Sequence, residues 1–301
     1  MAATGVQAQT VISNARTTPI LTSTATGSAR DDIRIASGGS IAISNGVAVT
    51  VDSNNFIDLD SGSSINMLNA ADGATAILVG PGASAANVTI GGNVSVTDNI
   101  DIYPDTDADG DLDGPFANGV DRFGLRVTGT TPLTGNVLIE STAVLQVEGN
   151  GARTVSIERG LTGNVAVFGS LRAVGTNAIA YNQIGAVSGS VNLGGAVATQ
   201  GQGATGASIQ GDVGGRLTLQ GNMSTTGYRS VTRPSDAAIG RLEADDLLQG
   251  GSTVVVGANV AGGVVLDIRP ADNSTTSTDE DNDGIQDATE GNATLQSFGA
   301  A

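Results

Sequence analysis

The chain has 301 residues, of which 39% are hydrophobic and only 3% aromatic, and a formal net charge of −17. This charge disfavours nucleic acid and anionic membranes as partners, because their phosphates would be repelled. The sequence contains no Cys, His or Lys, which excludes disulfides, thiolate or imidazole metal ligands, and the commonest catalytic bases and nucleophiles. A core built from Val, Ile, Leu and Ala is typical of stacked, similar layers.

The N-terminal residues predict export and a cap. Residues 1–8 end in Val-Gln-Ala, the small-x-small pattern of a cleavage site, and are interpreted as the remnant of a signal peptide. Residues 9–29 are rich in Thr and Ser with two short apolar pairs, and we expect an N-terminal cap there, since an open solenoid end exposes strand edges. No stretch approaches the ~18–20 apolar residues of a transmembrane helix, so no membrane insertion by this segment is expected.

The segment 30–268 predicts a β-solenoid. Short alternating runs such as IRIA, SIAI and VAVTV are separated by polar turns, and a phrase of the type Gly-Asn-Val recurs. It begins at Gly92, Gly135, Gly163, Gly189 and Gly211, and the last four follow at intervals of 28, 26 and 22 residues. Such intervals resemble the coils of a right-handed, single-stranded parallel β-helix. A β-sandwich is the alternative, because turn signals also recur roughly every 8–12 residues.

Two interruptions of this pattern are interpreted as insertions. The step from Gly92 to Gly135 is 43 residues and contains an acidic segment, which places one insertion near 98–122. A second is expected near 228–250, where the run from Asp236 to Gly250 is the only plausible helix. Acidic residues also crowd the C-terminal segment 269–301. Eleven of the 30 acidic residues lie within 105–113 and 279–290, so these two clusters require their own explanation.

The sharpest motif lies in that C-terminal segment. The run D-E-D-N-D-G-I-Q-D-A-T-E satisfies the calcium-loop pattern D-x-[DN]-x-[DN]-G-x₅-E. Calcium takes roughly 6–8 oxygen ligands, which alternating carboxylates and a final bidentate Glu can supply. Its flanks do not predict the helices of an EF-hand, and the run is similar to the loops of thrombospondin type 3 and related bacterial calcium repeats. An acidic linker without a bound ion is the alternative. The candidate ligands are Asp279, Asp281, Asp283, Asp287 and Glu290.

The first acidic cluster, D-T-D-A-D-G-D-L-D-G, predicts a second calcium loop, although its twelfth position is Phe116 instead of Glu. A carboxylate from elsewhere, such as Asp101 or Asp121, would then complete the ligand set. So many carboxylates in one short loop repel one another unless a cation neutralises them. A solvated acidic loop is the alternative. The candidate ligands are Asp105, Asp107, Asp109, Asp111 and Asp113.

The run TVISNARTTPILTSTATGSARDDIRIASGGSIAI, which begins at Thr10, resembles the start of autotransporter passenger domains from alphaproteobacteria. The later Gly-Asn-Val and Gly-Asp-Val phrases are also similar to passenger coils. The resemblance implies export through an outer-membrane barrel and a β-helical stalk displayed at the cell surface. The last residues, LQSFGAA, lack the alternating strands of such a barrel, so we expect a passenger without its membrane barrel. The resemblance carries over no catalytic residue.

The expected function is that of an extracellular, cell-surface structural or adhesive protein, stiffened by Ca²⁺ in its acidic loops and not an enzyme. Its expected partners are further copies of the chain or other cell-surface components. The alternative is a calcium-dependent surface-layer or matrix protein that self-assembles. A polysaccharide-acting β-helix enzyme is disfavoured, because the solenoid segment offers no outward row of Asp, Arg and aromatic side chains.

Overall fold

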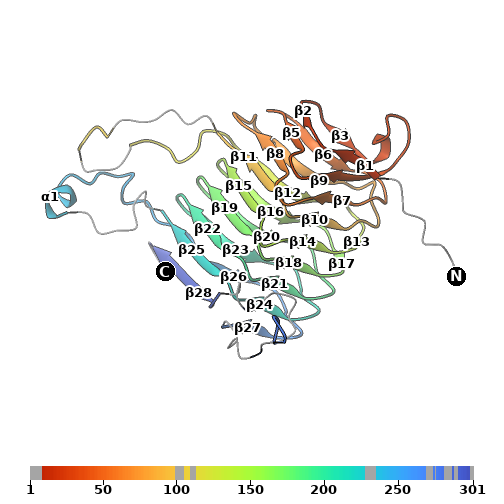
Figure 1. Cartoon of the computed structure of the whole chain (residues 1–301). Coiled ribbons are helices and arrows are strands. Elements are labelled where there is room, and N and C mark those ends of the chain that lie inside the picture. Colours follow the sequence, from red (N-terminus) through yellow and green to blue (C-terminus); the bar gives the residue numbers. More distant parts are fainter. Residues whose placement is uncertain are drawn as a thin grey trace.

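The computed structural model describes residues 9–98, 105–108, 113–227, 235–268, 274, 276–280, 287 and 291–298. Within them the chain winds into successive coils, and each coil contributes strands to three long parallel sheets, named here sheets A, B and C (Figure 1). The predicted fold class is confirmed: the protein is a nearly all-β parallel β-helix, stacked coil upon coil.

The strand bounds follow this winding. Sheet A has the order β1 (Gln9–Ile12), β4 (Asp32–Ile35), β7 (Ile57–Leu59), β10 (Val88–Ile90), β14 (Val137–Ile139), β18 (Val165–Val167), β21 (Val191–Leu193), β24 (Leu217–Leu219) and β27 (Val264–Leu266). Sheet B has the order β2 (Ala15–Arg16), β5 (Ser40–Ala42), β8 (Ser64–Met67), β11 (Asn93–Val96), β15 (Val144–Glu148), β19 (Ser170–Val174), β22 (Val197–Gln200), β25 (Asn222–Thr226) and β28 (Thr294–Phe298). Sheet C has the order β3 (Ile20–Leu21), β6 (Val47–Val51), β9 (Thr75–Val79), β12 (Phe123–Val127), β16 (Arg153–Ile157), β20 (Ile179–Gln183), β23 (Thr205–Ile209) and β26 (Val254–Val256).

Few other elements occur in the described part of the chain. The short strands β13 (Leu133–Thr134) and β17 (Leu161–Thr162) pair at the corner that leads from sheet C to sheet A. A 3₁₀ turn, η1 (Thr22–Thr24), follows β3. The helix expected between Asp236 and Gly250 is limited to α1 (Asp236–Ile239), which is capped by the Ser235 side chain. None of the described helices is long and apolar enough to cross a bilayer.

The core consists of columns of aliphatic side chains that run along the solenoid axis. Side chains alternate between the two faces of a strand, so most strands of sheet A bury their first and third residues and leave the middle one half-exposed. Register places equivalent residues directly above one another. Each buried aliphatic side chain contributes roughly 1.5–3 kcal/mol. One column, at most 1% exposed, comprises Ile57, Val88, Val137, Val165, Val191 and Leu217.

The recurring Gly-Asn-Val motif lies at the entry into sheet A, because its Asn side chain and its Gly each fit the backbone of a neighbouring coil. The Asn136 side chain accepts a hydrogen bond from the Asn164 N–H of the next coil at 2.8 Å, and Asn164 accepts one from Ser190 N–H at 2.8 Å. The residue before each Asn must be Gly, because a Cβ at Gly135 or Gly163 would lie 2.0 or 1.9 Å from a carbonyl oxygen of the preceding coil. The phrase therefore couples one coil to the next.

Two copies of the phrase are not equivalent to the others. The copy at Gly92 begins β11 in sheet B, and that at Gly211 lies at the corner where Val213 bridges Val187. The predicted intervals of 22 and 43 residues are therefore wrong as coil lengths. Register gives 26 residues from Val191 to Leu217, and 49 residues from Val88 to Val137. A three-residue motif is too short to show at which corner of a coil it lies.

Residues 9–29, expected to form a cap, contain the three strands of a first coil. β1, β2 and β3 each pair in parallel with the corresponding strand of the second coil. The inward side chains Ile12 and Ile20 are only 7% and 4% exposed, and Ala25, just after η1, packs against the core. The apolar interior is therefore covered at this end of the solenoid.

Candidate metal centre

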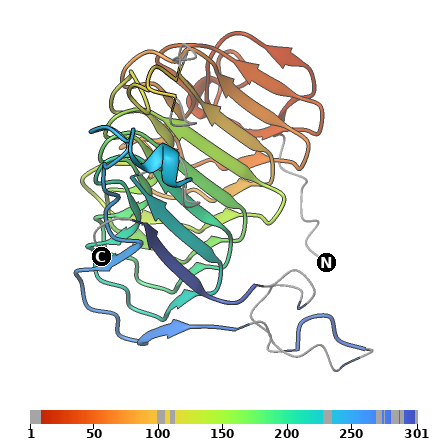
Figure 2. The ribbon, with the colours of Figure 1, turned by 90° about the vertical axis from the view of Figure 1, so that its left-hand side faces the viewer.

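Two long connections leave the solenoid at the same corner, between sheet B and sheet C. The first, residues 97–122, joins β11 to β12, and the second, residues 227–253, joins β25 to β26. Their described parts extend to one side of the coils and lie beside each other there (Figure 1 and Figure 2). A third, residues 267–293, joins β27 to β28 between sheets A and B. Residues far apart in sequence are thereby brought together outside the coils.

A buried ion pair closes the base of the first connection. Asp98 Oδ1 lies 3.3 Å from Arg122 Nη1, and Asp98 Oδ2 accepts hydrogen bonds from the N–H groups of Asn118 at 2.5 Å and Gly119 at 2.9 Å. Arg122 also donates to backbone carbonyls of two neighbouring coils. Burial opposes ionisation of Asp98, but these N–H groups and the Arg122 charge outweigh it and hold the Asp98 pKa below its ordinary value.

Three of the five predicted ligands in the first acidic cluster belong to the described residues. Asp113 accepts hydrogen bonds from the backbone N–H of Thr106, at 2.5 Å, and from its hydroxyl. One carboxylate oxygen of Asp107 is shielded from solvent, and Asp105 is exposed. Asp109 and Asp111 lie outside the described residues. The Asp113 contact folds the segment back on itself across the acidic run.

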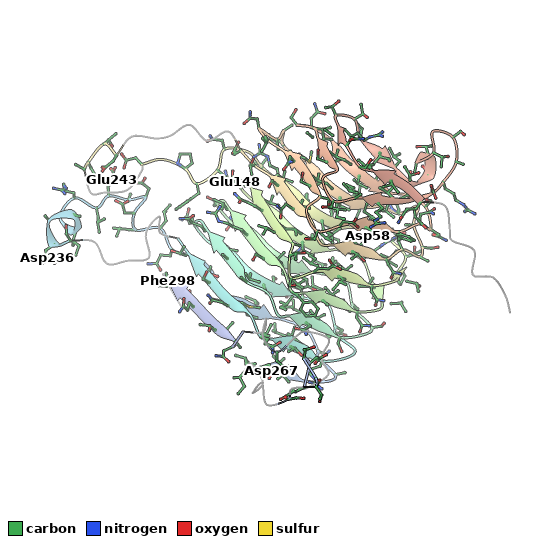
Figure 3. All side chains as sticks on the ribbon, viewed as in Figure 1. Asp58, Glu148, Asp236, Glu243, Asp267 and Phe298 are labelled. Carbon is green, nitrogen blue, oxygen red and sulfur yellow. The ribbon has the colours of Figure 1, made fainter. Side chains whose placement is uncertain are left out.

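The second connection brings further carboxylates to this cluster. Asp245 Oδ2 accepts a hydrogen bond from Gly114 N–H at 3.1 Å, which joins the two connections directly. The Asp246 carboxylate accepts one from Glu243 N–H at 2.7 Å. Glu243 is exposed, but partial desolvation raises its pKa, and the negative charges of Asp245, Asp113, Asp107 and Asp246 raise it further. These carboxylates lie close enough to repel one another. Figure 3 places Glu243 in this region, away from the coils.

The donor set suits a hard cation, because it consists of carboxylates. Within the described ranges, however, no three Asp or Glu side chains are arranged so that they could hold one metal ion. The carboxylates converge without forming a complete ligand cage there. The negative charge and the oxygen ligands of this cluster suit a cation. They come from two connections instead of from one loop.

The sequence analysis did not anticipate Glu243, Asp245 and Asp246. The run L-E-A-D-D-L-L was interpreted only as part of the expected helix between Asp236 and Gly250, although its acidic residues were the informative signal. Of the two closing ligands considered then, Asp121 lies on the coil. Its N–H donates to Asn150 O, and its charge acts on Arg153. Asp101 lies outside the described residues.

In the C-terminal motif the described residues are Asp279, Glu280 and Asp287, whereas Asp281, Asp283 and Glu290 lie outside them. Asp287 is 1% exposed, and its carboxylate accepts a hydrogen bond from Glu280 N–H at 3.1 and 3.2 Å. Its own N–H donates to Thr278 O at 2.9 Å. The ninth residue of the motif thus folds back onto the second.

The outer face of sheet A holds two carboxylates of one strand region, Asp58 and Asp60, whose pKa values shift in opposite directions. Arg34 Nη2 lies 2.7 Å from Asp60 Oδ2, and this hydrogen bond lowers the Asp60 pKa. Burial, and then the charge of Asp60, raises the pKa of Asp58. Opposed pKa shifts are the pattern of an acid and base pair. These residues, however, do not line the open pocket of about 640 Å³ that lies between sheets B and C, beside Ile43 and Leu68.

The chain matches no protein-family model, no curated protein and no solved structure with which it was compared.

Proposed function

We propose that the chain is an exported, cell-surface structural or adhesive β-helical protein whose acidic connections are stiffened by Ca²⁺. One observation carries the calcium part of this proposal: the connections 97–122 and 227–253 meet through the Gly114–Asp245 hydrogen bond and gather acidic side chains there. Bound Ca²⁺ would offset the mutual repulsion of these carboxylates. Asp107, Asp113, Glu243 and Asp245 would contribute carboxylates to it together with the predicted ligands Asp109 and Asp111, and Asp279 and Asp287 would contribute in the C-terminal motif.

Two observations support the structural part. Parallel β-sheets with half-exposed Ser, Thr, Asn and Ala on their outer faces form a regular surface suited to display. The resemblance of the N-terminal run to autotransporter passengers supports placement at the cell surface. An antibody against the purified chain should then label intact source cells. Labelling only after the cells are permeabilised would contradict the proposed location.

Calcium binding is tested by thermal melting of the whole chain with Ca²⁺, with Mg²⁺ and with a chelator. A cation that binds only the folded state stabilises it, by about 2.7 kcal/mol at a concentration 100-fold above Kd. We expect Ca²⁺ to raise Tm and Mg²⁺ to raise it less, because Mg²⁺ demands a stricter octahedral geometry. Equal melting curves in Ca²⁺ and chelator, together with no heat of binding in calorimetry, would remove both sites.

Variants separate the two sites. Asp245→Asn should weaken the site between the connections, and the double change Asp281→Asn and Asp283→Asn should weaken the C-terminal site. Asp236→Asn is the matched control, because it removes one negative charge from the same connection at α1, away from Glu243 (Figure 3). If Asp236→Asn reduced the calcium-dependent rise in Tm as much as Asp245→Asn, general charge screening would explain the effect.

A second candidate function, self-assembly, is favoured by the end of the solenoid that carries β26, β27 and β28. Inward side chains that are buried in earlier coils are exposed there: Val264 is 45% exposed and Leu266 is 57% exposed. Among the described residues, β26, β27 and β28 are also the last strands of their sheets, and such edges favour association.

A further inference from the structure

The corner between sheets C and A contains a buried arginine that plays no part in the acidic site. Arg159 follows β16 and is only 3% exposed. Register places Val127 of β12 beside Ile157 of β16, so Gly129 and Arg159 occupy equivalent positions in successive coils. The Arg159 side chain runs back along the axis, and its Nη2 donates to Ala83 O at 2.9 Å, 76 residues earlier in the sequence.

The intervening coil makes room for this side chain. A Cβ at Gly129 would lie 2.8 Å from Arg159 Nη1 and 3.1 Å from its Cδ, so a residue larger than Gly would displace the guanidinium. The guanidinium therefore occupies a niche that three successive coils build around it.

The positive charge in this niche has no counter-ion among the described residues. Its Nε and Nη1 are buried and donate no hydrogen bond to any described atom. The adjacent carboxylate, Glu158, is already bound by Arg126 through two hydrogen bonds of 2.9 and 3.0 Å. Burial lowers the Arg159 pKa, and no carboxylate opposes that shift. Because an arginine stays protonated in proteins, a buried charge with unsatisfied N–H groups is costly unless an anion compensates it.

We propose that this corner is a binding site for a small monovalent anion of the halide class, held by the Nε–H or an Nη1–H group of Arg159. The near-complete burial requires a small ligand. Carboxylates and phosphates prefer the planar fork of two guanidinium nitrogens, and here Nη2 is engaged by Ala83 O. A spherical halide accepts hydrogen bonds without that requirement. The anion would neutralise the charge at a point where three coils meet.

The direct test is diffraction from wild-type crystals soaked in sodium bromide. We expect an anomalous bromine peak within hydrogen-bonding distance of Arg159 Nε or Nη1. An ordered water at that position without anomalous signal would overturn the proposal. This experiment needs no variant, so it stays decisive even if a change at Arg159 prevents folding.

The solution test compares melting in sodium bromide and sodium gluconate at equal ionic strength. Binding to the folded state should raise the wild-type Tm in bromide by about 1–3 °C relative to gluconate. Arg159→Gln should abolish this difference. Arg34→Gln is the control, because it removes an arginine that is 44% exposed on the outer face of sheet A and is bound to Asp60 instead of to the neighbour of Arg159, and it should retain the difference. An equal bromide effect in wild type and Arg159→Gln would contradict the proposal.

Discussion

At the scale of single residues, the coils are coupled by side chains that bond to the backbone of the next coil. Asn87, Asn136 and Asn164 each accept a hydrogen bond from a backbone N–H one coil further along, at 2.8 Å in each case. These groups are exposed, so water competes for them, and each bond contributes about 0.5–1 kcal/mol. We expect Asn136→Ala to lower the free energy of unfolding by that amount, as measured by urea denaturation.

A matched variant distinguishes this hydrogen bond from other effects of the change. Asn136→Asp keeps an oxygen in the position that accepts the Asn164 N–H, and it should retain most of the stability. If Asp and Ala at position 136 were equally destabilising, the acceptor oxygen would not be the cause.

At the scale of elements, the first long connection depends on the ion pair at its base. The Asp98 pKa is lowered in the folded state, so its carboxylate contributes stability above its unfolded pKa of about 3.9. That contribution is lost as the pH falls through the lower folded value. We therefore expect hydrogen exchange in residues 97–122, corrected for the intrinsic rate, to accelerate steeply below about pH 4.

A substitution tests the same pair at neutral pH. Asp98→Asn leaves the buried Arg122 charge without its partner, and removing one member of a buried pair typically costs about 3–5 kcal/mol. Hydrogen exchange across 97–122 should then be fast at pH 7. Asp60→Asn is the control, because its partner Arg34 is 44% exposed and exposed pairs contribute only about 0–1 kcal/mol. Similar effects of the two substitutions would contradict the role assigned to Asp98.

The elements also show which features a sequence can predict. Alternating runs such as VAVTV specify strands because burial on one face requires a period of two, and the parallel β-helix followed from these runs. The equivalence of Gly92 and Gly211 with the other copies was wrong, because similar turns occur at different corners. The meeting of Gly114 with Asp245 was not predictable, since it depends on two connections leaving the same corner several coils apart.

At the scale of the whole molecule, the two ends of the solenoid differ. Ile12 and Ile20 of the first coil are buried, whereas the inward residues of the last strands are exposed. Leu266 pairs in register with Leu219, which is 2% exposed, but is itself 57% exposed. Within the described part of the chain, the aliphatic column therefore ends at an exposed apolar surface beside β26, β27 and β28, the last strands of their sheets. Such a surface stabilises an assembly if a further layer covers it.

This asymmetry leads to a prediction about association in solution. Sedimentation velocity of the purified chain should show concentration-dependent association. Leu266→Glu should weaken this association at least about tenfold. A tenfold change corresponds to about 1.4 kcal/mol, and burying a charge in that apolar surface costs more than this. Leu68→Glu is the matched control: Leu68 is 60% exposed but lies beside the open pocket between sheets B and C, so association should persist. A wild-type chain that stays monomeric at all concentrations, or equal weakening by both variants, would show that the open end is not the associating surface.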